Sequence, residues 1–225
     1  MIRVNDPFWS LRVKVCCISS VAEARLAIGY GASALGLVSA MPSGPGVVSD
    51  ETIAEVARIV PPPVASFLLT SRQDAAGIVE QQRRLRVTTL QLVDRLTVGT
   101  HRDLRAALPG IGLVQVIHVT GPESVEEALA VAPEVDALLL DSGNLALAVK
   151  ELGGTGRRHD WRLSREIREG AGVPVFLAGG LTPENVAEGI ATVRPFGLDL
   201  CSGVRTKGAL DEGKLERFFA AVAAA

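Results

Sequence analysis

Leu138-Leu-Leu-Asp-Ser142, running on into Gly153-Gly-Thr-Gly-Arg-Arg-His-Asp-Trp161, is the stretch of this chain that says most about its fold. An apolar run that ends abruptly in an acid is typical of a buried strand that brings one carboxylate to the rim of a cleft. The glycine-rich turn behind it exposes backbone N–H groups that could cradle an anion. Two more apolar runs, residues 173–180 and 197–204, reach glycines in the same way. This pattern favours a parallel barrel with phosphosugar chemistry at its strand ends.

The same alternation of apolar runs and amphipathic segments extends along the whole chain. The pattern predicts strands at 13–17, 33–38, 64–69, 88–92, 113–119, 135–140, 173–178 and 198–201. It predicts helices at 21–30, 50–60, 72–85, 100–108, 123–132, 161–169, 183–193 and 211–224. Three helix starts are signalled by an N-cap residue, namely Ser20, Ser49 and Thr182, the last of them followed by proline.

Strand–helix alternation with short connections implies parallel strands and right-handed crossovers. Eight such units in 225 residues match an α/β fold with a single (β/α)8 TIM barrel. An open doubly wound sheet is the alternative, which eight units make less favourable. We expect residues 1–12 to form an N-terminal extension and residues 13–225 the catalytic barrel domain.

Composition narrows the class of protein. Lys and Arg number 23 against 25 Asp and Glu, and aromatic residues make up 4%, so we expect no nucleic-acid partner. No apolar run reaches the ~18 residues of a membrane span, and the N-terminus has no apolar signal core. A cytoplasmic location without a membrane partner is therefore expected. Three cysteines and three scattered histidines lack ligand spacing, which predicts no metal.

A barrel of this kind places its active site at the C-terminal ends of the strands. This rule selects Cys16 and Cys17 after the first strand, and Asp141 and Ser142 after the sixth. The glycines after the last three strands complete the set. Cys17 and Cys201 are expected to face away from the site or into the barrel interior, as structural residues.

Four segments resemble one known family. They are Val13-Lys-Val-Cys-Cys-Ile-Ser19, Leu139-Leu-Asp-Ser142 with Gly153-Gly-Thr-Gly156 and Asp160-Trp161, Leu177-Ala-Gly-Gly-Leu-Thr-Pro-Glu-Asn-Val186, and Arg194-Pro-Phe-Gly-Leu-Asp-Leu-Cys-Ser-Gly-Val204. In this order and at these spacings they resemble the motifs of phosphoribosylanthranilate isomerases, and the similarity spans nearly the whole chain after the extension.

The resemblance implies an Amadori rearrangement in tryptophan biosynthesis, with Cys16 as general acid and Asp141 as general base. It also implies that the substrate phosphate binds main-chain N–H groups of the glycine turns, at Gly154, Thr155, Gly156, Gly179, Gly180, Ser202 and Gly203. Lys14 and Arg205 are further candidates for substrate binding. The partner is then a phosphorylated small molecule, no metal or organic cofactor is implied, and the protein is expected to be a monomer or homodimer.

Four positions depart from the family pattern. Gly46 stands where the family carries an arginine associated with the anthranilate carboxylate, and Val93 replaces a histidine. Cys17 replaces a glycine, and Arg205 a glutamate. Two readings therefore accompany the isomerase: a paralogue that isomerises or cleaves another phosphorylated sugar or aminosugar, and a barrel that binds a phosphometabolite without turnover. Within the isomerase reading, Arg205, Arg157 or Lys207 would supply the missing positive charge.

Overall fold

Strand β8 pairs with strand β1, and this pairing closes the sheet into a barrel. The computed structural model describes residues 11–144, 150–153 and 156–225, and in this part of the chain eight parallel strands form the barrel. They are β1 (Arg12–Val15), β2 (Ala34–Val38), β3 (Ala65–Thr70), β4 (Thr89–Leu92), β5 (Gly112–His118), β6 (Ala137–Asp141), β7 (Val175–Leu177) and β8 (Gly197–Leu200). Closure confirms the predicted (β/α)8 barrel and excludes the open sheet.

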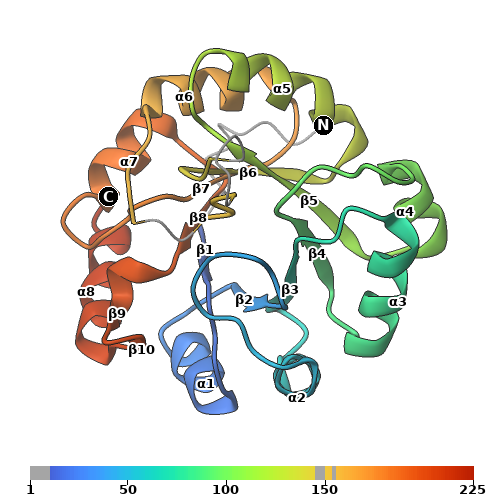
Figure 1. Cartoon of the computed structure of the whole chain (residues 1–225). Helices are drawn as coiled ribbons and strands as arrows, with labels where there is room; N and C mark the ends of the chain where they lie inside the picture. Colours follow the sequence, from blue (N-terminus) through green and yellow to red (C-terminus); the bar gives the residue numbers. More distant parts are fainter. Residues whose placement is uncertain (1–10, 145–149, 154–155) are drawn as a thin grey trace.

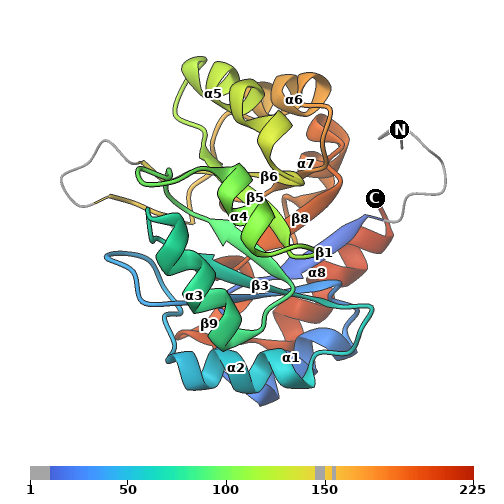
Figure 2. The same ribbon diagram turned by 90° about the vertical axis from the view of Figure 1, so that its right-hand side faces the viewer.

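A ring of helices surrounds the barrel (Figure 1), and the turned view shows them along its outer side (Figure 2). They are α1 (Val21–Gly29), α2 (Asp50–Ile59), α3 (Ala75–Leu85), α4 (His101–Ala107), α5 (Glu123–Val131), α6 (Trp161–Gly170), α7 (Val186–Val193) and α8 (Glu212–Ala223). Two short 3-10 turns, η1 (Ala132–Glu134) and η2 (Ser202–Val204), and a small hairpin of β9 (Arg205–Thr206) and β10 (Ala209–Leu210) complete the described elements. No helix among the described residues has the length and apolar character needed to cross a bilayer.

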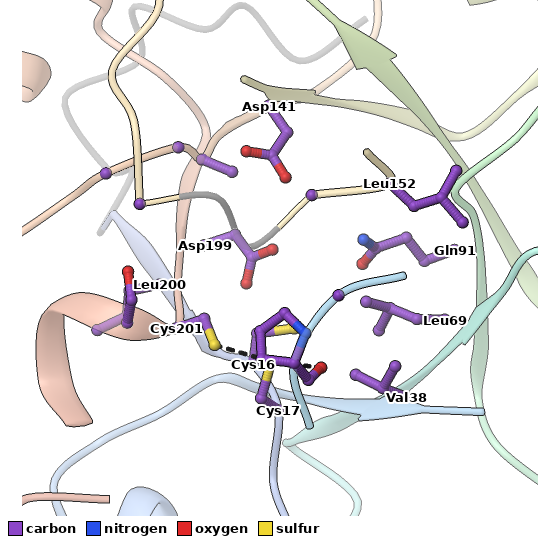
Figure 3. A pocket seen from close by; sticks show the side chains of 18 of the residues that line it. Cys16, Cys17, Val38, Leu69, Gln91, Asp141, Leu152, Asp199, Leu200 and Cys201 are labelled. Atoms are coloured by element: carbon purple, nitrogen blue, oxygen red, sulfur yellow. Dashed lines mark hydrogen bonds between the residues drawn. The ribbon is translucent and has the colours of Figure 1, made fainter. Parts of the chain in front are cut away.

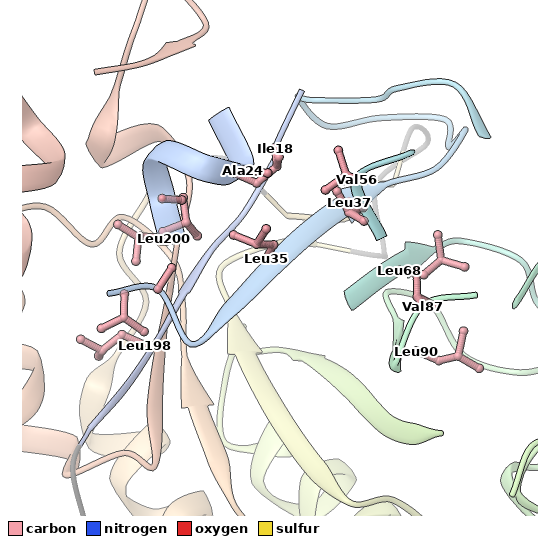
Figure 4. Packing of buried hydrophobic residues seen from close by; sticks show 14 of the residues in the cluster. Ile18, Ala24, Leu35, Leu37, Val56, Leu68, Val87, Leu90, Leu198 and Leu200 are labelled. Carbon is pink, nitrogen blue, oxygen red and sulfur yellow. The ribbon is translucent and has the colours of Figure 1, made fainter. Parts of the chain in front are cut away.

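The strands are apolar on both faces because each face is covered. Outward-facing Leu35, Leu37 and Leu68 belong to the cluster that packs against helical residues such as Ala24 and Val56 (Figure 4). Inward-facing residues fill the barrel itself, among them the pair Phe67 and Phe176, whose rings meet edge to face at 6.0 Å. Strands buried on both sides read as continuous apolar runs, which is why the sequence predicted them.

Two of the three predicted helix starts are confirmed. The Ser20 side chain accepts a hydrogen bond from the N–H of Glu23, and Ser49 accepts one from Thr52. The third prediction was wrong: α7 begins at Val186, and Thr182 does not cap it. Instead the side chain of Asn185 accepts a hydrogen bond from the N–H of Thr182, so a separate turn precedes the helix.

The domain boundary expected at residue 12 remains a prediction. Strand β1 already begins at Arg12, and residues 1–10 of the expected extension lie outside the described residues. Gly154 and Thr155, two of the residues expected to bind phosphate, also lie outside them.

Candidate active site

A cavity lies at the C-terminal ends of the barrel strands (Figure 3). Its lining comes from almost every part of the barrel rim: Cys16, Cys17, Val38, Met41, Ser43, Gly44, Pro45, Leu69, Gln91, Asp141, Leu152, Gly153, Gly156, Ala178, Gly179, Gly180, Leu181, Asp199, Leu200, Cys201 and Ser202. Its volume is about 60 Å³. Pockets that hold a ligand of substrate size measure roughly 300 Å³ or more. The described residues therefore leave less room than a pocket of that size offers.

Cys16 follows β1 directly, and its side chain is buried in the cavity lining. The space for it is made by Gly36 in the neighbouring strand β2, because a Cβ atom there would lie 2.6 Å from the Cys16 Sγ. The same Cβ would lie 3.0 Å from the Nζ of Lys14. The glycine at position 36 is thus explained: the side chains of Cys16 and Lys14 fill the space that a side chain there would need.

Asp141 ends β6, and its carboxylate is enclosed by glycines. Its Oδ1 accepts a hydrogen bond of 2.7 Å from the N–H of Ser142. A Cβ on Gly153 would lie 2.4 Å from Oδ2, and one on Gly179 would lie 3.2 Å from Oδ1. Both glycines adopt positive φ values of 124° and 80°. Backbone can therefore approach the carboxylate on two sides, which fixes the Asp141 side chain at the cavity wall.

Lys14 lies one layer below the cavity, fully buried inside the barrel. Its Nζ donates to the Oδ1 of Asp199 at 2.8 Å, and the two residues face each other in the β1–β8 register. Burial alone would lower the pKa of Lys14, but the Asp199 carboxylate outweighs it and raises that pKa, so the ammonium stays charged. Lys14 does not line the cavity itself; Asp199 does.

Three loops meet backbone to backbone on the glycine side of the cavity. Gly179 and Gly180 have successive positive φ values of 80° and 65°. A Cβ on Gly180 would lie 2.9 Å from the carbonyl oxygen of Gly156, and one on Gly203 would lie 2.0 Å from that of Leu181. The glycines after β6, β7 and β8 are therefore required by close loop packing, which brings Gly156, Gly179, Gly180 and Ser202 to one wall of the cavity.

Arg205 is not brought to the cavity. Its guanidinium forms two hydrogen bonds with the Glu23 carboxylate, at 3.0 and 2.9 Å, and donates to the carbonyl oxygen of Cys17 at 2.6 Å. Burial would raise the pKa of Glu23, but hydrogen bonds from Arg205 and from the N–H groups of Leu210 and Ser19 lower it to about 2. The geometry makes Arg205 a clamp between the β1–α1 loop and the segment after β8.

The other two cations suggested by the sequence also point elsewhere. Arg157 pairs with Glu151, and Lys207 lies at the turn of the β9–β10 hairpin. Among the described residues, no Lys or Arg side chain lines the cavity. The amino-acid sequence has no Lys or Arg at residues 145–149 or 154–155, which lie outside the described residues.

Cys17 and Cys201 were expected on the outer face or in the barrel interior, and the first alternative is wrong. Both pack with the cluster that fills the barrel, and both also line the cavity. Strand β1 ends at Val15, so the strand alternation no longer applies at Cys17, whose φ of 62° turns its side chain toward the rim. Cys201 likewise follows the end of β8. The two sulfur atoms share a hydrogen bond of 2.8 Å.

Sequence reasoning also missed Gln91 and Asp199 as lining residues. Gln91 is buried at 3% exposure, and its Oε1 has no hydrogen-bond partner among the described residues. Both residues lie near the C-terminal ends of β4 and β8, on the inward face. Alternation counted back from the strand ends could have selected them, since polar residues at inward positions near the catalytic rim are unusual in an apolar barrel.

The cavity brings together the two expected catalytic residues and an apolar wall. Cys16 and Asp141 line the same cavity, with Asp199 between them in the view of Figure 3. Val38, Leu69 and Leu152 lie on one side of the cavity in Figure 3 and form an apolar wall. The lining therefore combines this apolar wall with glycine-rich backbone, a thiol and a carboxylate.

Comparison with known proteins gives one consistent match. The sequence model of the family described as N-(5'phosphoribosyl)anthranilate (PRA) isomerase matches residues 13–221. A protein of Methanosarcina mazei named N-(5'-phosphoribosyl)anthranilate isomerase 2 is 38% identical over 210 residues, which are 92% of each chain.

Solved structures agree with this match. The crystal structure of phosphoribosyl anthranilate isomerase from Thermotoga maritima has a TM-score of 0.79 and 26% identity, and covers 96% of this chain and 100% of that chain. A phosphoribosyl anthranilate isomerase in complex with reduced 1-(o-carboxyphenylamino)-1-deoxyribulose 5-phosphate shares the fold, with a TM-score of 0.77, 24% identity and coverage of 96% and 100%.

Proposed function

The chain belongs to the family of N-(5'-phosphoribosyl)anthranilate isomerases, the aldose–ketose isomerases of tryptophan biosynthesis, and from this premise we propose that its cavity performs the family's reaction with Cys16 and Asp141. The reaction is the Amadori rearrangement of N-(5-phosphoribosyl)anthranilate to 1-(2-carboxyphenylamino)-1-deoxyribulose 5-phosphate. The observation that carries the assignment is that a buried thiol and a glycine-enclosed carboxylate line one cavity on the catalytic rim of the barrel.

Two proton transfers are needed. The Cys16 thiol protonates the furanose ring oxygen, and the ring opens to an iminium ion. The Asp141 carboxylate then removes the C2′ proton, which the iminium has made acidic, and the resulting enolamine tautomerises to the ketone.

The glycine wall supports the phosphate end. Successive positive φ values at Gly179 and Gly180 form a turn whose backbone N–H groups can converge on an anion. Asn185 braces this turn, because its Nδ2 donates to the Gly180 carbonyl at 2.8 Å. Ser202 and Gly203 add N–H groups at the start of η2, the position after the eighth strand where barrels commonly bind phosphate. Gly154, Thr155 and Gly156 remain predicted contacts of the same kind.

The apolar wall of the cavity suits the aromatic ring of the substrate. Val38, Leu69 and Leu152 offer apolar contact, and Gln91 offers an amide oxygen, Oε1, that accepts no hydrogen bond from the part of the chain that the structure describes. We assign the Gln91 amide a hydrogen bond to the substrate, since a buried polar group without a partner is costly until a ligand satisfies it. The Oε1 atom is an acceptor, so it would take a hydrogen bond from an N–H or O–H group of the substrate. Among the described lining residues no positively charged side chain replaces the family's arginine.

The test is direct turnover. Purified protein is mixed with freshly made N-(5-phosphoribosyl)anthranilate, and the loss of anthranilate-type fluorescence is followed. We expect fast decay in the wild type, slowed about a hundred-fold or more in Asp141→Asn and in Cys16→Ser, because each loses a proton-transfer group. Asparagine can keep the hydrogen bond from Ser142 N–H, so circular dichroism should show an intact fold.

Absence of decay in a well-folded wild type would mean that the cavity serves a different phosphosugar. Near-wild-type turnover in either variant would remove that residue from its role. A cytoplasmic location and a monomeric or homodimeric state remain predictions alongside this assignment.

A further inference from the structure

Three thiols gather at one corner of the cavity, although the proposed reaction uses only one of them. Cys16 and Cys17 follow β1, and Cys201 follows the neighbouring strand β8. The Sγ atoms of Cys17 and Cys201 are 2.8 Å apart, less than 1 Å longer than a disulfide bond of about 2.05 Å. Figure 3 marks this contact beside Cys16. The two sulfur atoms therefore need little movement to become bonded.

We propose that Cys17 and Cys201 form an oxidisable dithiol site, which reacts with a hydroperoxide to give a Cys17–Cys201 disulfide and thereby slows the isomerase reversibly. The site lies outside the acid–base pair, and its formation does not depend on which sugar phosphate the cavity accepts.

The surroundings divide the two thiols into an attacking and a resolving partner. Cys201 is only partly buried, whereas Cys17 is 5% exposed. The hydrogen bond with Cys17 lowers the pKa of Cys201. The nearby Arg205 and Lys14 charges act in the same direction, against the opposite effects of burial and of the Asp199 carboxylate. Hydrogen bonding with Cys16 and Cys201, together with burial, raises the pKa of Cys17. Partly exposed thiolates near cations are the reactive cysteines of proteins.

The chemistry balances with a hydroperoxide as the only co-reactant. The Cys201 thiolate attacks one peroxide oxygen, the O–O bond breaks, and the alcohol or water leaves as Cys201 becomes a sulfenic acid. The Cys17 thiol then attacks the Cys201 sulfur, the S–S bond forms, and the hydroxyl leaves as water. Two thiols lose two electrons and two protons, and the hydroperoxide is reduced to an alcohol, or to water, and a second water.

A Cys17–Cys201 disulfide would affect the proposed reaction because both cysteines are next to residues of the site. Cys17 is the next residue after Cys16, the proposed acid. Cys201 precedes Ser202 and Gly203, which belong to the proposed phosphate site at the glycine wall. Drawing the two sulfur atoms together moves the backbone on both sides of the substrate. A displacement of about 1 Å in an active site can cost a hundred-fold in rate, so we expect turnover to fall about tenfold or more.

The experiment treats the full-length protein with a small excess of hydrogen peroxide, blocks free thiols with an alkylating agent, and maps tryptic peptides with and without reductant. Cleavage after Lys14, Arg25, Arg168 and Arg205 places Cys16 and Cys17 in peptide 15–25 and Cys201 in peptide 169–205. Fragmentation between the adjacent cysteines then tells which of them is linked. We expect two of three thiols to be lost, a 15–25 to 169–205 cross-link at Cys17, and recovery of thiols and turnover with dithiothreitol.

Three variants sharpen the result. Cys201→Ser should slow oxidation of Cys17 about tenfold or more, because the thiolate is the reacting species. Cys17→Ser should leave a sulfenic acid on Cys201 without a cross-link. Cys16→Ser is the matched control: it keeps the dithiol pair, so the cross-link should form whether or not the protein isomerises anything.

Other outcomes overturn the proposal. A cross-link at Cys16, irreversible oxidation of Cys201 without any link, or undiminished turnover in fully cross-linked wild-type protein would each do so. If Cys16→Ser forms the link while no isomerase activity is found in any sample, the dithiol site stands and the proposed function fails.

Discussion

A Cβ atom on Gly46 would lie 2.5 Å from the Cβ of Cys17, so this backbone cannot accommodate side chains at both positions. The resembling family motifs carry glycine at the position of Cys17 and arginine at that of Gly46. Cys17 adopts a φ of 62°, a left-handed conformation that glycine adopts readily. The two departures from the family are therefore one exchange: the cysteine occupies the space at the root of the missing arginine.

This exchange predicts a strong energetic coupling. Gly46→Arg alone should lower the free energy of unfolding by about 2 kcal/mol, because its Cβ clashes with Cys17 and its φ of 79° is strained for a side chain. In Cys17→Gly/Gly46→Arg most of the clash disappears, and we expect a coupling of about 1 kcal/mol or more. Urea unfolding of the wild type, both single variants and the double variant measures it. Additive effects would show that the contact carries no energy.

The same double variant tests the aromatic end of the cavity. A restored guanidinium can form a charge-assisted contact with a carboxylate, worth about 1.5–3 kcal/mol. The KM for N-(5-phosphoribosyl)anthranilate should therefore fall about tenfold in the double variant, with a smaller change in kcat. An unchanged KM would place the carboxylate away from position 46.

The features of the fold and site that the sequence predicts are those whose signals lie within a short stretch of the chain. Barrel strands and helices were predictable because continuous apolar runs and caps such as Ser20 and Ser49 are signals that extend over only a few residues. Cys16 and Asp141 were placed by a rule about strand ends, and the structure brings both to one cavity. The same rule selected Cys17, but the orientation expected for its side chain was missed because a positive φ turns it toward the cavity just beyond the strand.

Contacts between distant segments were not predictable from local pattern. Arg205 looked like a substrate contact because of its place in a motif, yet its partner Glu23 lies 182 residues earlier in the chain. The contacts of Gly46 with Cys17 and of Lys14 with Asp199 are likewise set by the closed barrel. A single sequence carries no signal for such pairs.

Gly153 should be required for the placement of the Asp141 carboxylate. In Gly153→Ala the new Cβ would lie 2.4 Å from Oδ2, and we expect kcat to fall about tenfold or more as the carboxylate is displaced. Gly110→Ala is a matched control, since Gly110 also has a positive φ but nothing within 4 Å of its Cβ position. Both variants should lose about 1 kcal/mol of stability, and only the first should lose turnover. Equal turnover in the two would argue against the contact.

Glu23 should make stability depend on pH in the acid range. Its pKa is lowered to about 2 in the folded chain from an ordinary 4.5, so its contribution is present above pH 4.5 and is lost as the pH falls toward 2. At pH 7 we expect Glu23→Gln to lower the free energy of unfolding by about 2–3 kcal/mol, which is less than the pKa shift alone implies because solvent partly screens the ion pair. The difference from the wild type should shrink by about 1–2 kcal/mol at pH 3. If the stability difference between the wild type and Glu23→Gln is the same at pH 7 and pH 3, the Glu23–Arg205 pair does not lower the pKa of Glu23.

Removing one partner of the buried Lys14–Asp199 pair should destabilise the fold strongly, whereas replacing both partners should not. Lys14→Met leaves the Asp199 carboxylate buried without its cation, which should cost about 3–5 kcal/mol of the free energy of unfolding at pH 7. Burial already raises the pKa of Asp199 in the wild type, and loss of the Lys14 cation, which lowers it, raises it further. The variant should therefore be most stable below about pH 4 and lose stability as the pH rises.

Lys14→Met/Asp199→Leu separates the charge from the packing. With both charges removed, stability at pH 7 should return to within about 1–2 kcal/mol of the wild type, since apolar replacement of a buried pair is often neutral. Turnover should remain low, because Asp199 lines the cavity between Cys16 and Asp141. Urea unfolding at pH 4 and pH 7, with the fluorescence assay alongside, measures both effects. A double variant as unstable as Lys14→Met would mean that packing rather than unpaired charge causes the loss.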